Sequence, residues 1–338
     1  MLRQLPLVAP RHRQGHVDTL SLAKVSPALI GGLSVLLLAS VLQPRPEIFA
    51  PGELSTDLDE ASITFTPDQK TAFFVLRAFF TTSPPASVIC DSHLKAGHWT
   101  PPKVVPFSGI ELDGSPSVSP DGKTLYFASR RRLSGHRSND WNLFVVALNG
   151  ESSFGEPEPL GERINTEANE INPSASDDGS LYFASDRGSG DGFSIYRAAP
   201  GQPPVKLPAE VNAGTSTAQP FIARDQSLIL FASYGRPDAL IAGGHPYDRP
   251  DLYLSEFRDR RWRPARHLVH GINTYAAESF PSVSPDGKWL FFSSERAGLD
   301  LPLERPLDTA QWLQKCRSIL NGHSNFYRIP ISALELSQ

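Results

Sequence analysis

Three histidines, each preceded by glycine, are the residues with the most direct potential for metal-dependent chemistry. They lie in long polar segments, as Gly135-His136, Gly244-His245 and Gly322-His323. Three neutral imidazoles on one surface can bind Zn²⁺ or Mn²⁺, and such a metal would support hydrolase or lyase chemistry. Histidines in loops are common without any such role. We therefore expect neither a metal nor another cofactor at these positions.

Acidic residues form a second set of candidates. They recur three positions before a repeated proline position, with a threonine in one repeat: Glu60, Asp113, Glu170, Thr217 and Glu278. Gathered in a ring, such carboxylates would attract a cation or a basic partner. The alternative is ion pairing with arginines farther along each repeat, namely Arg77, Arg131, Arg187 and Arg296. We favour the ion pairs, because a residue that recurs in every repeat is usually structural.

The distribution of charge argues against nucleic acid as a partner. The chain of 338 residues has a formal net charge of −4, of which residues 1–42 carry +3, leaving −7 on the remainder. An acidic body without runs of Lys or Arg lacks the basic surface that phosphate backbones require. The sequence also contains no nucleophile elbow, phosphate-binding glycine loop, HExxH pair or dinucleotide fingerprint. Catalytic groups that converge from distant segments leave no such motif, so an enzyme is not excluded.

The elements that would position these residues are set by an internal repeat. Three clear copies are SPSVSPDGKTLYFAS (115–129), NPSASDDGSLYFASDR (172–187) and FPSVSPDGKWLFFSSER (280–296), and two weaker copies cover 62–76 and 219–233. Each copy predicts a strand, an Asp-Gly-type turn and a second strand. A third predicted strand follows each copy, at 87–93, 141–148, 193–198, 251–257 and 325–331. With a poorer fourth strand, each unit is a β-propeller blade, so the fold class is all-β.

Five blades account for the repeats, but the last unit has no residues for its outer strand. Residues 45–60 resemble residues 156–170, which connect an outer strand to the next blade. We therefore predict that residues 45–54 supply the missing strand of blade five and close the ring. Closure of this kind leaves no open sheet edge. Cys90 and Cys316 then belong to neighbouring blades, and we favour two separate thiols over a disulfide between them.

The repeat resembles the WD40-like PD40 repeat of TolB-like periplasmic proteins. The resemblance rests on the PS-x-S-x-DG-x-LYFAS pattern and covers roughly residues 46–331. It implies a β-propeller and a place in the cell envelope. TolB-like proteins also carry an α/β domain before the propeller, and the segment between residue 42 and the first repeat leaves no room for it. Prolyl-oligopeptidase-like enzymes add a hydrolase domain, which we do not expect in the few residues after 331.

The amino-terminal residues 1–42 indicate export. A basic leader precedes an uninterrupted apolar stretch at residues 28–42. As a helix these residues span about 22 Å, short of the roughly 30 Å hydrocarbon core, which suits a signal peptide. The long leader leaves a second alternative open, an uncleaved amino-terminal anchor in the inner membrane. Residues 43–338 form the propeller, which we expect in the periplasm or another extracytoplasmic space.

The repeat is broken most in the loops between second and third strands, which all emerge on one face. The long loops are residues 130–140, 234–251 and 295–324. In the last, Asp308 can cap a helix bearing the apolar stripe Trp312, Leu313, Cys316, Ile319 and Leu320, and we expect this helix to cover blade five as a lid. Arginine and aromatic residues favour binding. The predicted binding residues are Arg130, Arg131, Arg132, His136, Trp141, His245, Tyr247, Trp312 and His323.

Two functions fit these features. The first is an exported, non-catalytic propeller that binds a protein or glycan partner of the cell envelope through its loop face. The second is a carbohydrate-active hydrolase or lyase that uses the same face, with or without a metal. A pocket with converging carboxylates and histidine would favour the enzyme, and its absence would favour the binding protein. We expect membrane contact only through residues 28–42, where these remain uncleaved.

Overall fold

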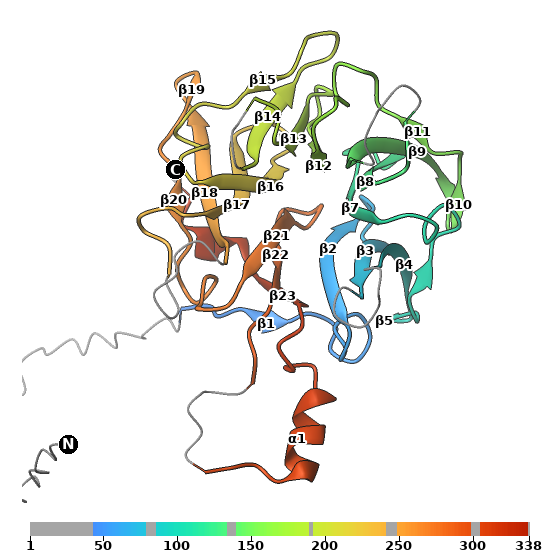
Figure 1. Ribbon diagram of the computed structural model, residues 1–338, viewed down its shortest axis with the longest axis vertical. Coiled ribbons are helices and arrows are strands. Elements are labelled where there is room, and N and C mark those ends of the chain that lie inside the picture. Colours follow the sequence, from blue (N-terminus) through green and yellow to red (C-terminus); the bar gives the residue numbers. More distant parts are fainter. Residues whose placement is uncertain are drawn as a thin grey trace, which may run out of the picture. The chain divides into compact units, whose positions relative to one another are not determined.

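The structure is a five-bladed β-propeller, as the repeats predict (Figure 1). This computed structural model describes residues 43–78, 86–133, 140–188, 192–240, 249–298 and 305–336. Blade one comprises β2 (Asp59–Phe65), β3 (Thr71–Arg77), β4 (Ser87–Lys95), β5 (His98–Trp99) and β6 (Lys103–Val104). Blade two comprises β7 (Asp113–Val118), β8 (Thr124–Ser129), β9 (Asn142–Gly150), β10 (Ser153–Phe154) and β11 (Glu158–Pro159).

The remaining blades follow the same antiparallel order. Blade three comprises β12 (Glu170–Ala175), β13 (Leu181–Ser185), β14 (Ser194–Ala198) and β15 (Val205–Lys206). Blade four comprises β16 (Ser216–Ile222), β17 (Leu228–Tyr234), β18 (Asp251–Arg258), β19 (Arg261–Trp262) and β20 (Arg266–His267). Blade five comprises β21 (Glu278–Val283), β22 (Trp289–Ser294), β23 (Asn325–Pro330) and the amino-terminal β1 (Glu47–Ile48). A short 3₁₀ helix, Ile331–Leu334, follows β23.

The predicted closure of the ring by the amino-terminal strand is confirmed. In β1, Glu47 lies opposite Arg328 and Ile48 opposite Tyr327 in an antiparallel register with β23. The pairing continues beyond the strand, because the Phe49 N–H donates to the Phe326 carbonyl at 2.8 Å. Residues from the two ends of the chain therefore share one sheet, which removes the open edge of blade five.

The inner strands, β2, β7, β12, β16 and β21, line the central channel and each contains a bulge. The bulged residues adopt positive φ between 51° and 57°: Ser62, Ser115, Asn172, Gln219 and Phe280. Hydrogen bonds near the channel join each blade to the next. Examples are Asn172 Nδ2 to Ser115 Oγ at 2.6 Å and Phe280 N to Gln219 Oε1 at 2.8 Å. The bulges thus turn polar groups toward neighbouring blades and fix the width of the channel.

The Asp-Gly turns are structural, as predicted. Asp121 Oδ1 accepts hydrogen bonds from Ser119 Oγ at 2.6 Å and from the Lys123 N–H at 3.1 Å. Gly122 follows with φ of +73°, and Gly287 in blade five has φ of +70°. Both glycines occupy the left-handed region that the second turn position requires.

The segment before each inner strand carries a side chain that imitates a strand edge. Asn273 accepts from the Leu252 N–H at 2.7 Å and donates to the Leu252 carbonyl at 2.9 Å. Asn165 and Asn212 make the same pair of bonds to Leu143 and Ile195. Side chains at the same place thereby satisfy the backbone where the short outer strands end.

The helix in the last loop forms, but it does not cover blade five. Helix α1 spans Thr309–Cys316, and Asp308 caps it in a capping box with Gln311. None of its residues is buried, and Trp312 and Leu313 are 45% and 48% exposed. The predicted lid is wrong because the helix ends at Cys316, so Ile319 and Leu320 leave its apolar stripe. Leu320 instead packs against the core beside blade five, while α1 projects from the ring (Figure 1).

The amino-terminal prediction lies outside the described residues. These begin at Gln43, so neither the signal-peptide nor the anchor alternative for residues 28–42 falls on them. Within the described ranges, no helix is both long enough and apolar enough to cross a bilayer.

The two cysteines are separate thiols, and they are expected to differ in reactivity. Cys90 is buried in β4, where burial raises its pKa to about 12, whereas Cys316 is exposed at the end of α1. Because the thiolate is the reactive form, a thiol reagent should label Cys316 in the native protein and Cys90 only after unfolding. Thiol titration with and without urea measures this. Two unreactive cysteines that become labelled only after reduction would indicate a disulfide instead.

Candidate functional site

The acidic residues that begin the inner strands are buried. They form hydrogen bonds and ion pairs with the segment that precedes the strand and with their own blade. Glu170 is fully buried and accepts hydrogen bonds from Thr166 N at 2.9 Å and Thr166 Oγ1 at 2.8 Å. Ser185 Oγ lies 3.0 Å away, and Arg187 Nη2 pairs with the carboxylate at 2.9 Å. Burial raises the pKa of Glu170, and the bonds from Thr166 and the charge of Arg187 oppose this.

Two further blades repeat the arrangement. Glu278 is held by Thr274, Ser294 and Arg296, with the guanidinium 3.2 Å away. Asp113 is held by Ser108 Oγ at 2.7 Å and pairs with Arg131 Nη2 at 3.3 Å. The favoured alternative, ion pairing with the arginines, is therefore what these blades show. Such carboxylates tie each linker to its blade.

The arginines of these pairs are also held between aromatic rings. Arg296 lies over Phe292 and Tyr327, with its guanidinium carbon 5.4 and 4.5 Å from the ring centroids. Arg131, Arg187 and Arg236 stack on the corresponding ring pairs of blades two, three and four. Arg131, which we expected on the binding face, therefore connects a cation–π stack to an ion pair.

Blade one departs from this pattern at Glu60. Leu76 and Ala78 occupy the positions of the serine and the arginine, and Arg77 pairs with Asp59 at 2.6 Å. Glu60 keeps only the bonds from Thr56 N and Thr56 Oγ1, both to Oε1, and among the described residues Oε2 has no partner. The side chain is 1% exposed, and burial raises its pKa to about 7.

The loop-face candidates do not assemble into one site among the described residues. His136, His245 and Tyr247 lie outside those residues. His323 is half-buried, and its N–H donates to Asn321 Oδ1 at 2.9 Å. Trp141 packs partly against the blade two–three core, and Arg130 is half-buried. Arg132 and Trp312 are exposed on this face.

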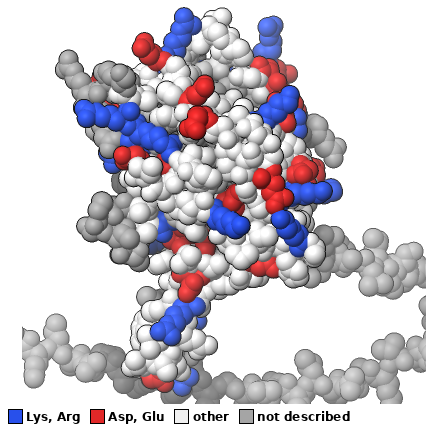
Figure 2. All heavy atoms as spheres, turned by 90° about the vertical axis from the view of Figure 1, so that its right-hand side faces the viewer, with Lys and Arg blue, Asp and Glu red and all other residues white. Residues whose placement is uncertain are grey.

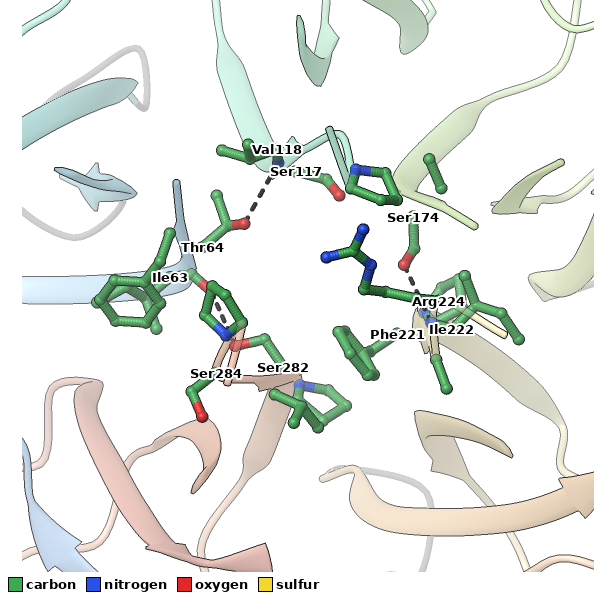
Figure 3. Close-up of a pocket in the computed structure, with 18 of the residues that line it drawn as sticks. Ile63, Thr64, Ser117, Val118, Ser174, Phe221, Ile222, Arg224, Ser282 and Ser284 are labelled. Atoms are coloured by element: carbon green, nitrogen blue, oxygen red, sulfur yellow. Dashed lines mark hydrogen bonds between the residues drawn. The ribbon is translucent and has the colours of Figure 1, made fainter. Parts of the chain in front are cut away.

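A cavity in the central channel is the best-formed site in the described part of the chain. Its volume is about 330 Å³, and it is lined by the second halves of the five inner strands, by residues of their turns, and by Ile331 and Leu336 after β23. The buried acids at the starts of these strands do not line it, so the cavity belongs to the turn end of the channel. Figure 3 shows side chains from all sides converging on it.

Equivalent positions of the repeat line the cavity in two successive rings. One ring consists of Thr64, Ser117, Ser174, Phe221 and Ser282. The ring nearer the turns contains Pro67, Pro120, Pro285 and Arg224, with Asp177 at the equivalent position of blade three. Blade four thus contributes a phenyl ring where other blades have hydroxyls, and a guanidinium where three blades have proline. Arg224 is the only charged residue among the described ones that line the cavity.

Three of the four hydroxyls in the first ring are engaged between blades. Thr64 Oγ1 accepts from the Val118 N–H at 3.3 Å, and Ser174 Oγ accepts from the Ile222 N–H at 3.0 Å. Ser282 Oγ donates to the Ile63 carbonyl at 2.9 Å. No hydrogen bond joins Ser117 Oγ to another described residue. Among the described residues of the lining there is no carboxylate and no imidazole, the side chains that most often act as general acid or base.

Sequence reasoning placed the site on the loop face and missed the channel. The signal was present in the weakest repeat, QPFIARDQSLILFAS, where Arg224 stands at the position of the proline in SPSVSPDG. A single substitution within a repeat strand looks like ordinary divergence between copies, whereas an inserted loop is easily noticed in the sequence. The channel position becomes informative only when the inner strands are known to converge.

Comparison with known proteins assigns the chain to no family. No protein-family model matches it, and no curated protein matches it. Among solved structures, it is similar to TolB from Acinetobacter baumannii, with 18% identity, TM-score 0.45, and coverage of 81% of this chain and 54% of that chain. It therefore spans about half the length of that protein.

Two other similar structures have different descriptions. A putative TolB from Agrobacterium tumefaciens is 15% identical over 81% of this chain and 90% of that chain, with TM-score 0.44. An α-L-arabinofuranosidase from Podospora anserina, solved with cellotriose, is 12% identical over 85% and 96% of the two chains, with TM-score 0.44. At such low identity these likenesses concern the fold and not the ligand.

Proposed function

We propose that the protein is an exported, non-catalytic propeller that binds a partner of the cell envelope through its central channel. The observation that carries this proposal is the 330 Å³ cavity, whose described lining consists of apolar side chains, hydroxyls, the amides of Asn172 and Gln219, and Arg224. Hydrolases and lyases need a positioned acid or base, and the described residues of this lining include no carboxylate or imidazole. The buried acids at the other end of the channel are committed to their linkers and, in three blades, to arginines. Binding therefore suits this site better than catalysis.

Export is part of the proposal and is supported by the sequence of residues 1–42. A protein or glycan partner suits the acidic net charge of residues 43–338 better than nucleic acid does. On the face shown in Figure 2, basic and acidic side chains are interspersed, without an extended basic patch. A dense row of phosphates would find no continuous counter-charge there.

A second candidate surface is favoured by the exposed face of α1. Trp312 and Leu313 lie next to each other on this helix and are each nearly half exposed. Exposed tryptophan on a projecting element is a common anchor in protein interfaces. In this alternative, a protein partner docks on the loop face beside α1 and Arg132, as the sequence predicts. The two surfaces lie at opposite ends of the channel and can be tested separately.

Filling the channel should abolish partner capture. Ser117→Trp places a large ring into the cavity without breaking any hydrogen bond made by the replaced side chain. Gln202→Trp adds the same ring at an exposed turn of blade three and serves as the control. We expect affinity capture from the envelope fraction to be lost with Ser117→Trp and kept with Gln202→Trp, at similar melting temperatures. If the Ser117→Trp variant still captured the partner and the Trp312→Ala variant did not, the binding site would be at α1 and not in the channel.

A further inference from the structure

Blade four gives the channel a chemistry that the other blades do not share. Phe221 replaces a hydroxyl, and Arg224 replaces the proline found at the same position in blades one, two and five. Arg224 pairs with Asp177, which replaces the same proline in blade three, so its Nε joins two blades. This contact explains neither the open terminal nitrogens of Arg224 nor the presence of Phe221. Both side chains lie at the same cavity, on one strand and the turn that follows it (Figure 3).

Arg224 is held from one side and is open on the other. Its Nε donates to Asp177 Oδ1 at 2.9 Å, and the Asp177 N–H donates to the Arg224 carbonyl at 2.8 Å. No hydrogen bond joins its two terminal nitrogens to any described residue, and the guanidinium reaches toward the centre of the channel (Figure 3). A guanidinium oriented through Nε presents Nη1 and Nη2 as a fork. This is the geometry that binds a carboxylate bidentately.

The remaining walls set the rest of the ligand. Phe221, Phe280 and the channel prolines Pro116, Pro173 and Pro281 give the cavity an apolar surface. Ser117 adds one hydroxyl that no described residue engages. A volume of about 330 Å³ lies at the small end of the range for small-molecule sites, so a compact group fills it.

Building on the proposed binding function, we infer that the channel takes a carboxylate carried on a flat apolar body, with Arg224 as its anchor. The carboxylate meets the terminal nitrogens of Arg224, and the apolar body packs against Phe221 and the prolines. A free small acid and the end of a polypeptide with an aromatic last residue share this chemistry. A neutral sugar would give the two terminal nitrogens of Arg224 no charged acceptor and would meet walls with few open polar groups.

Carboxylates in the turns around the cavity weaken the attraction for an anion but do not abolish it. Asp286 pairs with Lys288 at 3.1 Å, and Lys123 lies 4.0 Å from Asp121, so these turn carboxylates are partly balanced. Asp177 is the carboxylate nearest Arg224, and the side chains of this pair are 54% and 53% exposed. It both orients the guanidinium and repels an incoming anion. Asp177→Asn keeps an oxygen for Nε and removes the repulsion.

The test uses para-fluorophenylacetate as the probe and para-fluorophenylacetamide as its uncharged counterpart, with binding followed by fluorine NMR. We expect the acid to bind and the amide to bind at least about tenfold more weakly, since hydrogen bonds to charged groups carry this much. Arg224→Met should lower the affinity for the acid by a similar factor, and Asp177→Asn should keep or raise it. Arg261→Met removes the same charge from the exposed outer strand of blade four and should change nothing. Higher salt should weaken binding of the acid and not of the amide.

A second arm distinguishes the two sources of the carboxylate. An acetylated tripeptide ending in para-fluorophenylalanine is compared as the free acid and as the amide. Binding of the peptide acid alone, or more tightly than the small acid, points to a chain end, and the reverse points to a free acid. Equal binding of acid and amide, or unchanged binding in Arg224→Met, would overturn the inference about charge. If the charge inference failed in this way but Ser117→Trp still blocked both probes, the proposal that the channel binds a ligand would remain supported.

Discussion

Phe49→Ala is expected to lower the free energy of unfolding by about 3–5 kcal/mol, the usual cost of removing a buried phenyl group. Phe49 is only 8% exposed, and its ring contacts Phe291 and Phe65 at centroid distances of 4.8 and 5.9 Å. It belongs to the segment that closes the ring, so its loss also loosens β1 from β23. Urea denaturation measures the change. Leu58→Ala, at a side chain 53% exposed in the same segment, is the control and should change stability little.

Deleting residues 43–54 tests the closure itself. The deletion removes β1, Phe49 and the buried Leu54, and it exposes the outer edge of β23. An unpaired edge of this kind invites pairing with another chain, so we expect a lower melting temperature and aggregation. Size-exclusion chromatography with light scattering detects the latter. A truncated protein that remains monodisperse with an unchanged melting temperature would show that the closing strand contributes nothing to stability.

The fold could be predicted because its signals are repeated. Copies of one strand–turn–strand pattern fix blade number, strand order and the Asp-Gly turns, and an error in one copy is corrected by the others. Ring closure followed from counting strands, since blade five had no outer strand of its own. The helix at residues 309–316 was also foreseen from Asp308, but the prediction that it covers blade five as a lid was wrong. Apolar residues at helical spacing share one face only within the helix, and α1 ends at Cys316, before Ile319.

The candidate site could not be predicted in the same way, because its features occur once. Arg224 and Phe221 are single departures within a blade, and a sequence shows them only as a poorer copy of the repeat. Glu60 is a comparable case. An acidic residue recurs at its position in other blades, but the serine and arginine that bind the carboxylate there are absent from blade one. Sequence spacing paired Glu60 with Arg77, but Arg77 lies one position before the stacked arginines of the other blades and binds Asp59 instead. The consequence for Glu60 is visible only in three dimensions.

The buried Glu60 carboxyl is expected to make stability depend on pH. Its ordinary pKa of 4.5 rises to about 7 in the folded protein, because burial penalises the charge, and among the described residues no cation is paired with it. Between these two values the folded state binds more protons than the unfolded state, so the free energy of unfolding falls as pH rises. Below this interval both states are protonated and no penalty exists. Above it both are ionised, and the full penalty of burying the carboxylate applies.

Glu60→Gln should therefore stabilise the protein at about pH 8, by up to about 3 kcal/mol, and have little effect near pH 5. The amide keeps an oxygen to accept the bonds from Thr56 and carries no charge at any pH. Glu278→Gln is the matched control, because it leaves the stacked Arg296 without its carboxylate and should destabilise the protein at about pH 8. Urea denaturation at several pH values measures both variants against the wild type. A stability difference for Glu60→Gln that does not grow with pH would mean that Glu60 is ionised in the folded protein and has a counter-charge.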